Sequence, residues 1–271
     1  MIDELASFRE KIDALDTELL RLLNERAEYA KEIGAIKNRQ SLPIYSPDRE
    51  MKLLCNLVNR SQGPLRPEAI RAIYREIMSA SIALEKDIAI ACMGPMGSSS
   101  HHHSLQKFGS SVRYSFHATI PEIFDAVTSK HADCGVVPLQ DSAQRFNEIS
   151  LDALAETSLL ICNEISSGIN ERHIVIGHQS NAPTGMDRTL LMLRIKNPSE
   201  NLACAIHLIE KEAHSFTHLA TRPSLKNSEE VNVFVQADGH KSEIHDSDLY
   251  KSLLPHCQEI KILGSYPKPL I

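Results

Sequence analysis

The hydrophobic pattern is most regular at the start of the chain, over residues 2–39. Apolar residues recur there at steps of three and four positions: Leu5, Phe8, Ile12, Leu15, Leu19, Leu22, Ala30 and Ile33. This is the repeat of an α-helix, and no proline precedes Pro43, so the pattern predicts one helix of roughly 50 Å. Because a small domain cannot cover so long an apolar stripe, we expect a second copy of the chain to pack along it.

Two cations interrupt the stripe. Arg26 and Lys37 occupy positions that the helical repeat assigns to the buried face. Either both side chains extend their charged ends out of the seam into water, or both point inward. Periodicity alone leaves these two interpretations open.

Two shorter helices complete a first domain, residues 1–86. Pro43 ends the long helix, and Ser46 with Pro47 supplies a capping hydroxyl and a first-turn proline for the second helix. The third helix opens at Pro67 and runs to residue 86 through apolar residues at helical spacing. The pattern therefore predicts a three-helix domain with one helix far longer than the others.

The pattern changes beyond residue 86 to short apolar runs that alternate with helical stretches. Over residues 87–179 this alternation predicts one α/β lobe. It includes a run of three histidines among serines, which is typical of a purification-tag scar or a metal-binding tract. We favour neither, because a strand, a glycine turn and a helix ending at Phe108 accommodate this run without an insertion.

A linker at 181–185, rich in Pro, Gly and Asn, precedes the last segment, residues 187–271. Its runs predict strands at 189–195, 216–221, 231–236 and 260–263, with helices at 202–212 and 247–254. This is a βαββαβ order. The whole chain is therefore predicted as a multi-domain protein of helical and α/β parts.

Composition excludes several classes of function. The chain has 271 residues, 42% of them hydrophobic, and a formal net charge of −6, so it lacks the basic surface of a nucleic-acid-binding protein. It has no apolar run of membrane-spanning length and no secretion signal, so we expect a cytoplasmic protein without a membrane partner. The six cysteines include no Cys-x-x-Cys pair, which favours reduced thiols. No metal or cofactor is predicted.

Residues 1–86 carry several short motifs in a fixed order. They are Phe8-Arg9-Glu10-Lys11-Ile12-Asp13-Ala14-Leu15-Asp16, Leu22-Leu23-Asn24-Glu25-Arg26, Glu32-Ile33-Gly34 with Lys37, Pro43-Ile44-Tyr45, Asp48-Arg49-Glu50 and Ser79-Ala80-Ser81. In order and spacing they resemble the all-helical class of chorismate mutases. The resemblance implies an intertwined homodimer whose substrate is the dianion chorismate.

The resemblance also implies a role for each matching residue. Arg26, together with Arg9 from the partner subunit, binds the two carboxylates, and Lys37 donates to the ether oxygen of the breaking bond. With Glu85 these are the catalytic candidates. The other implied substrate-binding residues are Ser46, Arg49, which supports Lys37, Glu50, which accepts from the substrate hydroxyl, and Ser81.

The chemistry of the implied reaction fits these residue types. A [3,3] rearrangement needs no nucleophile, proton shuttle or metal. It needs a flexible dianion held in a compact conformer while negative charge grows on the ether oxygen. The planar arginine fork suits carboxylates, and lysine suits a single oxygen. A pocket that holds several cations can supply both.

Two positions depart from the family pattern. Ser46 replaces a frequent aspartate but keeps the capping role, and Glu85 replaces a glutamine that in many relatives donates to the ether oxygen. An ionised carboxylate cannot donate a hydrogen bond. Glu85 can therefore help only as the neutral acid, so we expect turnover to rise as the pH falls from about 8 towards about 5.

The α/β lobe carries altered forms of three motifs. They are Gly94-Pro95-Met96-Gly97-Ser98-Ser99-Ser100, Gln140-Asp141-Ser142 and Glu171-Arg172-His173. Residues 87–179 resemble the first lobe of prephenate dehydratase, in which these stretches read Gly-Pro-Glu-Gly-Thr-Phe-Ser, Glu-Asn-Ser and Thr-Arg-Phe. The family's second lobe is missing here. Because ligands of such folds bind between the lobes, we expect a truncated domain without dehydratase activity.

Features of the last segment point to regulation. The pair Arg222-Pro223 and the end 262–267 resemble the ACT domain that closes these fusions and senses phenylalanine. Glu200 replaces a glycine of the effector loop, and Ala220-Thr221 replace Glu-Ser. Two interpretations stay open, a phenylalanine effector site and a domain that only dimerises.

These segments together predict a chorismate mutase in phenylalanine biosynthesis with a degenerate dehydratase body. Two alternatives remain. One is a bifunctional enzyme that retains both activities, and the other is a non-catalytic regulatory protein that uses its ACT domain. The inward cations favour an enzyme, because a cluster of unpaired buried cations is costly without an anion to bind.

Overall fold

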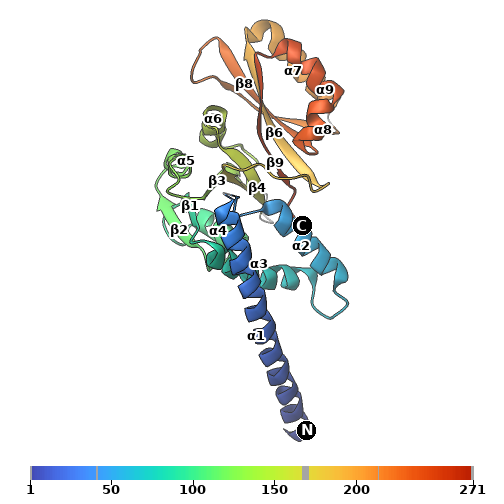
Figure 1. The fold of residues 1–271 in the computed structure, drawn as a ribbon. Helices are drawn as coiled ribbons and strands as arrows, with labels where there is room; N and C mark the ends of the chain where they lie inside the picture. Colours follow the sequence, from blue (N-terminus) through green and yellow to red (C-terminus); the bar gives the residue numbers. More distant parts are fainter. Residues whose placement is uncertain (1, 41, 167–170, 213, 270–271) are drawn as a thin grey trace.

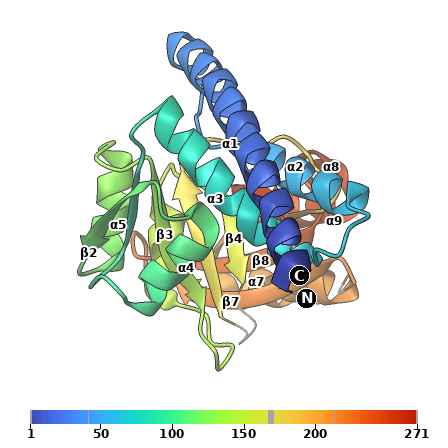
Figure 2. The same cartoon turned by 90° about the horizontal axis from the view of Figure 1, so that it is seen from below.

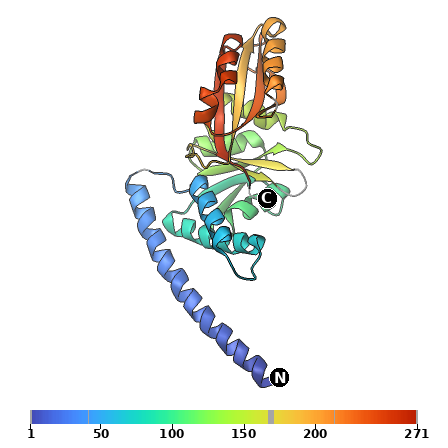
Figure 3. The same cartoon turned by 90° about the vertical axis from the view of Figure 1, so that its right-hand side faces the viewer.

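The computed structural model describes residues 2–40, 42–166, 171–212 and 214–269 (Figure 1). The predicted long helix is confirmed as α1 (Ile2–Arg39), and its N-terminal half extends away from the rest of the chain (Figures 1 and 3). The next two helices are α2 (Pro47–Arg60) and α3 (Pro67–Glu85). Figure 2 shows α1 crossing α3, which it contacts.

Gly34 lies where α1 and α3 come closest. A Cβ atom at this position would lie 2.7 Å from the Cα atom of Glu85. Only glycine therefore allows the two helices to approach this closely. Ser46 precedes α2 as predicted, but the prediction that its hydroxyl caps the helix is wrong, because its side chain makes no capping hydrogen bond and instead lines a cavity.

The α/β lobe is built on one mixed sheet with the strand order β2-β1-β3-β5-β4. The three strands β2, β1 and β3 are parallel, and β5 is antiparallel to both of its neighbours. The strands are β1 (Ala89–Met93), β2 (Arg113–His117), β3 (Cys134–Gln140), β4 (Leu160–Ser166) and β5 (Arg172–Gly177). The helices are α4 (Ser99–Phe108), α5 (Ile120–Thr128) and α6 (Glu148–Glu156).

The last segment has the predicted βαββαβ order and an antiparallel sheet, β7-β8-β6-β9. Its strands are β6 (Asp187–Lys196), β7 (Phe216–Pro223), β8 (Glu230–Asp238) and β9 (Glu259–Pro267). Its helices are α7 (Pro198–Lys211), α8 (Lys241–Asp246), α9 (Asp248–Leu253) and the 3₁₀ turn Leu254–His256. The sequence prediction placed the start of α7 at 202 and missed α8, a helix of six residues with a capping box at His240 and Glu243. The domain boundaries 1–86, 87–179 and 187–271 stay predictions.

The helices and sheets form successive layers (Figure 1). Three apolar cores lie between them. One core joins Tyr45 and Phe108 to one face of the first sheet. The second lies between the other face of that sheet, α5, α6 and the second sheet. The third joins the far face of the second sheet to its helices. Along β6 the side chains alternate between the last two cores, as a strand buried on both faces requires.

The run of histidines belongs to the fold. These residues lie in α4, where the ring of His101 contacts Tyr114 and Phe116 and the ring of His103 stacks on His173, with centroids 4.2 Å apart. The preference for a helix over a tag scar is therefore confirmed. All six cysteines are free thiols, and three of them are buried. None of the helices in the described ranges is both long and apolar enough to cross a membrane.

Candidate active site

One cavity of about 530 Å³ lies between the three N-terminal helices. Seven of the eight predicted site residues line it: Arg26, Lys37, Ser46, Arg49, Glu50, Ser81 and Glu85. They come from α1, α2, α3 and the loop before α2. Apolar side chains, including Leu53 and Ile82, form the rest of its wall. Residues that are far apart in the sequence thus meet around a space that fits a small molecule.

The two cations of the α1 stripe point into this cavity rather than out into water. The guanidinium of Arg26 donates to the hydroxyl of Ser81, which in turn donates to the carbonyl of Ile77 at 2.8 Å. The ammonium of Lys37 donates to a carboxylate oxygen of Glu85 at 3.0 Å and to the carbonyl of Ile44 at 2.9 Å. The side chains of Lys37 and Glu85 are 22% and 10% exposed, so water screens this pair only in part.

Glu50 has a partner that the sequence analysis missed. Its carboxylate accepts a hydrogen bond of 2.8 Å from the ammonium of Lys107, and the two side chains are 15% and 18% exposed. Lys107 lies on α4, in the other domain. No motif or helical spacing connects it with Glu50, so only the folded chain identifies it.

The charges of the cavity favour an anion. Each of the two carboxylates, Glu50 and Glu85, is paired with a lysine. Within the described ranges, Arg26 and Arg49 form no ion pair with a carboxylate. Their two positive charges therefore remain available to carboxylates of a ligand.

Arg9 is the predicted site residue that lies elsewhere. It is exposed on the free half of α1, among apolar side chains that are also exposed, such as Leu15 at 63%. Within this chain it cannot reach the cavity, because the α1 residues that line the cavity lie between Arg26 and Lys37, in the opposite half of the helix. Its predicted role requires a second subunit along α1.

Comparison with known proteins identifies two segments of the chain. The family model for chorismate mutase type II matches residues 8–86, and that for prephenate dehydratase matches residues 90–183. A bifunctional chorismate mutase/prephenate dehydratase of Aquifex aeolicus is 29% identical over an alignment that covers 100% of this chain and 99% of the relative. The chain therefore carries a chorismate mutase type II domain followed by a prephenate dehydratase domain.

The alignment with the Aquifex aeolicus enzyme runs over 360 positions, whereas this chain has 271 residues. A long stretch of the relative therefore has no counterpart here. The bifunctional enzyme of Pseudomonas aeruginosa is 24% identical, with 99% of both chains covered. The crystal structure of prephenate dehydratase from Streptococcus mutans shares the fold, with a TM-score of 0.52 and 22% identity over 66% of this chain and 97% of that one.

The dehydratase-like domain has a cavity of its own, of about 390 Å³, that borders the second sheet. Its centre is Glu164, which is 3% exposed and pairs with Arg172 at 2.9 Å and Arg188 at 2.7 Å. Burial raises the pKa of Glu164, but the two arginines outweigh this effect and hold the pKa below its usual value. Arg172 is the arginine of the altered Thr-Arg-Phe motif. It thus forms an ion pair with a carboxylate of its own chain.

The other residues of the altered motifs do not gather around Arg172. Glu171 lines the same cavity, but His173 is buried against His103. Burial and the neighbouring imidazole lower the pKa of His173 to about 4, so this side chain is neutral near pH 7. Ser142 is exposed on a turn.

In the C-terminal unit, Arg222 from the predicted effector motif faces the dehydratase-like domain. Its guanidinium pairs with Asp152 at 2.7 Å and with Glu148 at 2.6 Å, both on α6. The hydrogen bond to Asp152 is the main reason that the pKa of Arg222 is raised. Arg222 therefore connects β7 of the second sheet to α6 of the dehydratase-like domain. Phenylalanine binding stays a prediction.

Proposed function

We propose that this protein is a chorismate mutase that converts chorismate to prephenate by a [3,3] rearrangement. The observation that carries the proposal is the single cavity in which Arg26, Lys37 and Arg49 meet. Such a cavity suits a compact dianion, because within the described ranges neither Arg26 nor Arg49 forms an ion pair with a carboxylate of the protein. The match of residues 8–86 to the chorismate mutase type II model and the similarity to the bifunctional relative support the same activity.

Each cation has a distinct part in the proposed mechanism. Arg26 binds one carboxylate of chorismate, and Arg9 of the partner subunit binds the other. Lys37 donates to the ether oxygen, on which negative charge grows as the carbon–oxygen bond breaks. A donor that is already in position needs no reorganisation at that moment, so it stabilises the transition state more than the bound substrate.

A second candidate function is prephenate dehydratase. The relatives that align over the full chain are named as bifunctional, and this favours retention of both activities over the loss that the sequence analysis predicted. Two observations argue for loss: the pairing of Arg172 with Glu164, and the single sheet of the dehydratase-like domain.

One experiment separates these functions. Pure protein is incubated with chorismate, and prephenate and phenylpyruvate are measured over time. We expect prephenate to form. Its accumulation indicates a mutase alone, and its conversion to phenylpyruvate indicates a bifunctional enzyme. If neither product forms, the mutase proposal fails and a non-catalytic regulatory role remains.

We also propose that the βαββαβ unit is an ACT domain with phenylalanine as its effector. A prephenate dehydratase from Arthrobacter aurescens, which is 14% identical and shares the fold with a TM-score of 0.55, was solved in complex with L-Phe. Calorimetric titration with phenylalanine tests this proposal, with tyrosine as the comparison ligand. Absence of heat with both would leave a domain that only dimerises.

A further inference from the structure

The mutase cavity is bordered by side chains of two domains. Lys107 on α4, Asn163 on β4 and Gln179 after β5 all belong to the dehydratase-like half, yet each bonds to a residue of the cavity wall. The wall residues that they hold are Glu50 and Tyr45. A domain that was expected only as a remnant thus takes part in the mutase site.

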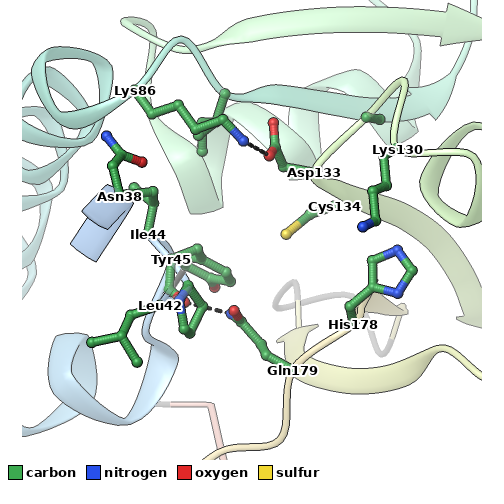
Figure 4. A pocket seen from close by; sticks show the side chains of 13 residues that line it. Asn38, Leu42, Ile44, Tyr45, Lys86, Lys130, Asp133, Cys134, His178 and Gln179 are labelled. Atoms are coloured by element: carbon green, nitrogen blue, oxygen red, sulfur yellow. Dashed lines mark hydrogen bonds and ion pairs between the residues drawn. The ribbon is translucent and has the colours of Figure 1, made fainter. Parts of the chain in front are cut away.

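Tyr45 is fixed from two sides. Its hydroxyl accepts a hydrogen bond of 2.9 Å from Asn163, and its ring lies 4.9 Å from that of Phe108, measured between centroids. Its carbonyl accepts from the side chain of Gln179, as Figure 4 shows. The loop that carries Ser46 therefore has the dehydratase-like domain as its support.

The helix that carries Lys107 is fastened to α3. A Cβ atom at Gly109, which directly follows α4, would lie 2.6 Å from the Cβ atom of Ser79. Two backbone amides of the following turn donate to α3, from Ser110 to Glu76 and from Ser111 to Ser79, each at 3.0 Å. The end of α4 thus has a fixed position relative to the helix that carries Ser81 and Glu85.

We propose that Lys107 is a positioning residue of the mutase site, which holds Glu50 towards the hydroxyl of chorismate and neutralises its charge. This inference rests on the proposed function. Without Lys107, the carboxylate of Glu50 lies unpaired beside a dianionic substrate, which it repels. The dehydratase-like domain is then required for full mutase activity, whether or not it has activity of its own.

The proposal makes a specific kinetic prediction, because the substrate hydroxyl takes no part in the rearrangement. Misplacement of Glu50 therefore weakens the binding of the substrate and of the transition state by the same amount. This raises KM and leaves kcat unchanged. In the full chain we expect Lys107→Met to raise KM for chorismate about tenfold and to keep kcat within about twofold. Lys107→Arg retains the charge, so we expect its KM to stay near the wild-type value.

Lys86→Met is the matched control. Lys86 also bridges the two domains, through an ion pair of 2.6 Å with Asp133 (Figure 4), but it does not line the mutase cavity. We expect its KM to stay within about twofold of the wild type. An equal rise of KM in both methionine variants would indicate a general loosening of the domain contact and would overturn the proposal.

A double-mutant cycle tests the link to Glu50 directly and also serves if Lys107→Met alone folds poorly. In the Glu50→Gln background there is no charge to neutralise, so adding Lys107→Met should change KM by less than about twofold. Independent, additive effects would contradict the proposal, as would an unchanged KM in Lys107→Met. A wild-type protein that turns over no chorismate would instead show that the proposed function itself is wrong.

Discussion

Arg26 and Lys37 have different hydrogen-bond partners in the cavity. Arg26 bonds to a neutral hydroxyl, whereas Lys37 bonds to the carboxylate of Glu85. Losing either removes a donor that stabilises the transition state, so we expect Arg26→Ala and Lys37→Ala each to lower kcat/KM by about 10² or more. Steady-state kinetics with chorismate measures this.

Two residues on the same helix provide controls for these variants. Arg21 and Lys31 are exposed on α1 and pair only with glutamates of that helix. Alanine at either position removes the same charge from a surface where ion pairs contribute little. Near-normal turnover in Arg26→Ala or Lys37→Ala would place the site elsewhere.

Glu85 occupies the position of a donor but accepts from Lys37 in the structure. An ionised carboxylate so near the growing charge on the ether oxygen repels it, and an amide does not. We therefore expect Glu85→Gln to raise kcat at about pH 7.5. Glu68→Gln, an exposed change on the same helix, is the control. A slower Glu85→Gln enzyme would mean that Lys37 serves the ether oxygen alone.

At the residue level, the sequence predicted which side chains meet but not everything that holds them. Arg26 and Lys37 could be predicted because both interrupt one helical repeat. The partner of Glu50 could not, because Lys107 follows it by 57 positions in a different domain. The predicted capping role of Ser46 was wrong because the cavity, like the pair of Glu50 with Lys107, is formed only in the folded chain. Its local sequence fits a cap, but the side chain lines the cavity instead.

At the scale of elements, α1 is the helix that its own chain leaves uncovered. Its apolar residues from Leu5 to Leu22 are about half exposed, and Arg9 lies among them. Periodicity predicted the length of the helix, but periodicity cannot identify what covers it. A second copy fits, because it would bring Arg9 to the partner's cavity and bury both stripes.

Mixing two inactive variants tests this arrangement. Arg9→Ala and Arg26→Ala are each expected to be nearly inactive, but a mixed dimer has one site with both arginines intact. Random exchange of subunits should therefore restore about a quarter of wild-type activity. The measurement is turnover after the subunits are mixed, unfolded and refolded together. If mixing restored no activity, the proposal that Arg9 acts in the partner's cavity would be wrong. Leu15→Glu is the companion variant and should shift the protein towards monomer in light scattering.

At the scale of the whole molecule, the sequence predicted the order of the parts but not their contacts. The βαββαβ order followed from alternating apolar runs, since each strand and helix has its own period. The junctions did not, because they include polar pairs such as Arg222 with Asp152, which leave no periodic signal. The buried stack of His103 and His173 is a contact of this kind, between α4 and β5.

That stack predicts how the molecule responds to acid. The pKa of His173 is lowered to about 4 by burial and by His103, and within the described ranges its Nδ1 atom has no hydrogen-bond partner. In the unfolded chain this imidazole takes a proton near pH 6.5, whereas in the folded protein it stays neutral until about pH 4. Protonation therefore favours the unfolded state. The free energy of unfolding should be unaffected above about pH 6.5 and should fall by up to about 3 kcal/mol as the pH drops towards 4.

His173→Phe isolates this effect, because a phenyl ring fills similar space and does not titrate. We expect urea unfolding at about pH 7.5 and about pH 4.5 to show a smaller loss of stability for this variant than for the wild type. His131→Gln, on an exposed turn, should lose as much stability as the wild type. If His173→Phe loses as much stability as the wild type, other groups control acid unfolding. If it loses less, the contact between α4 and β5 is the acid-sensitive part of the fold. Since α4 carries Lys107, mutase KM should then rise in the same pH range in the wild type but not in His173→Phe.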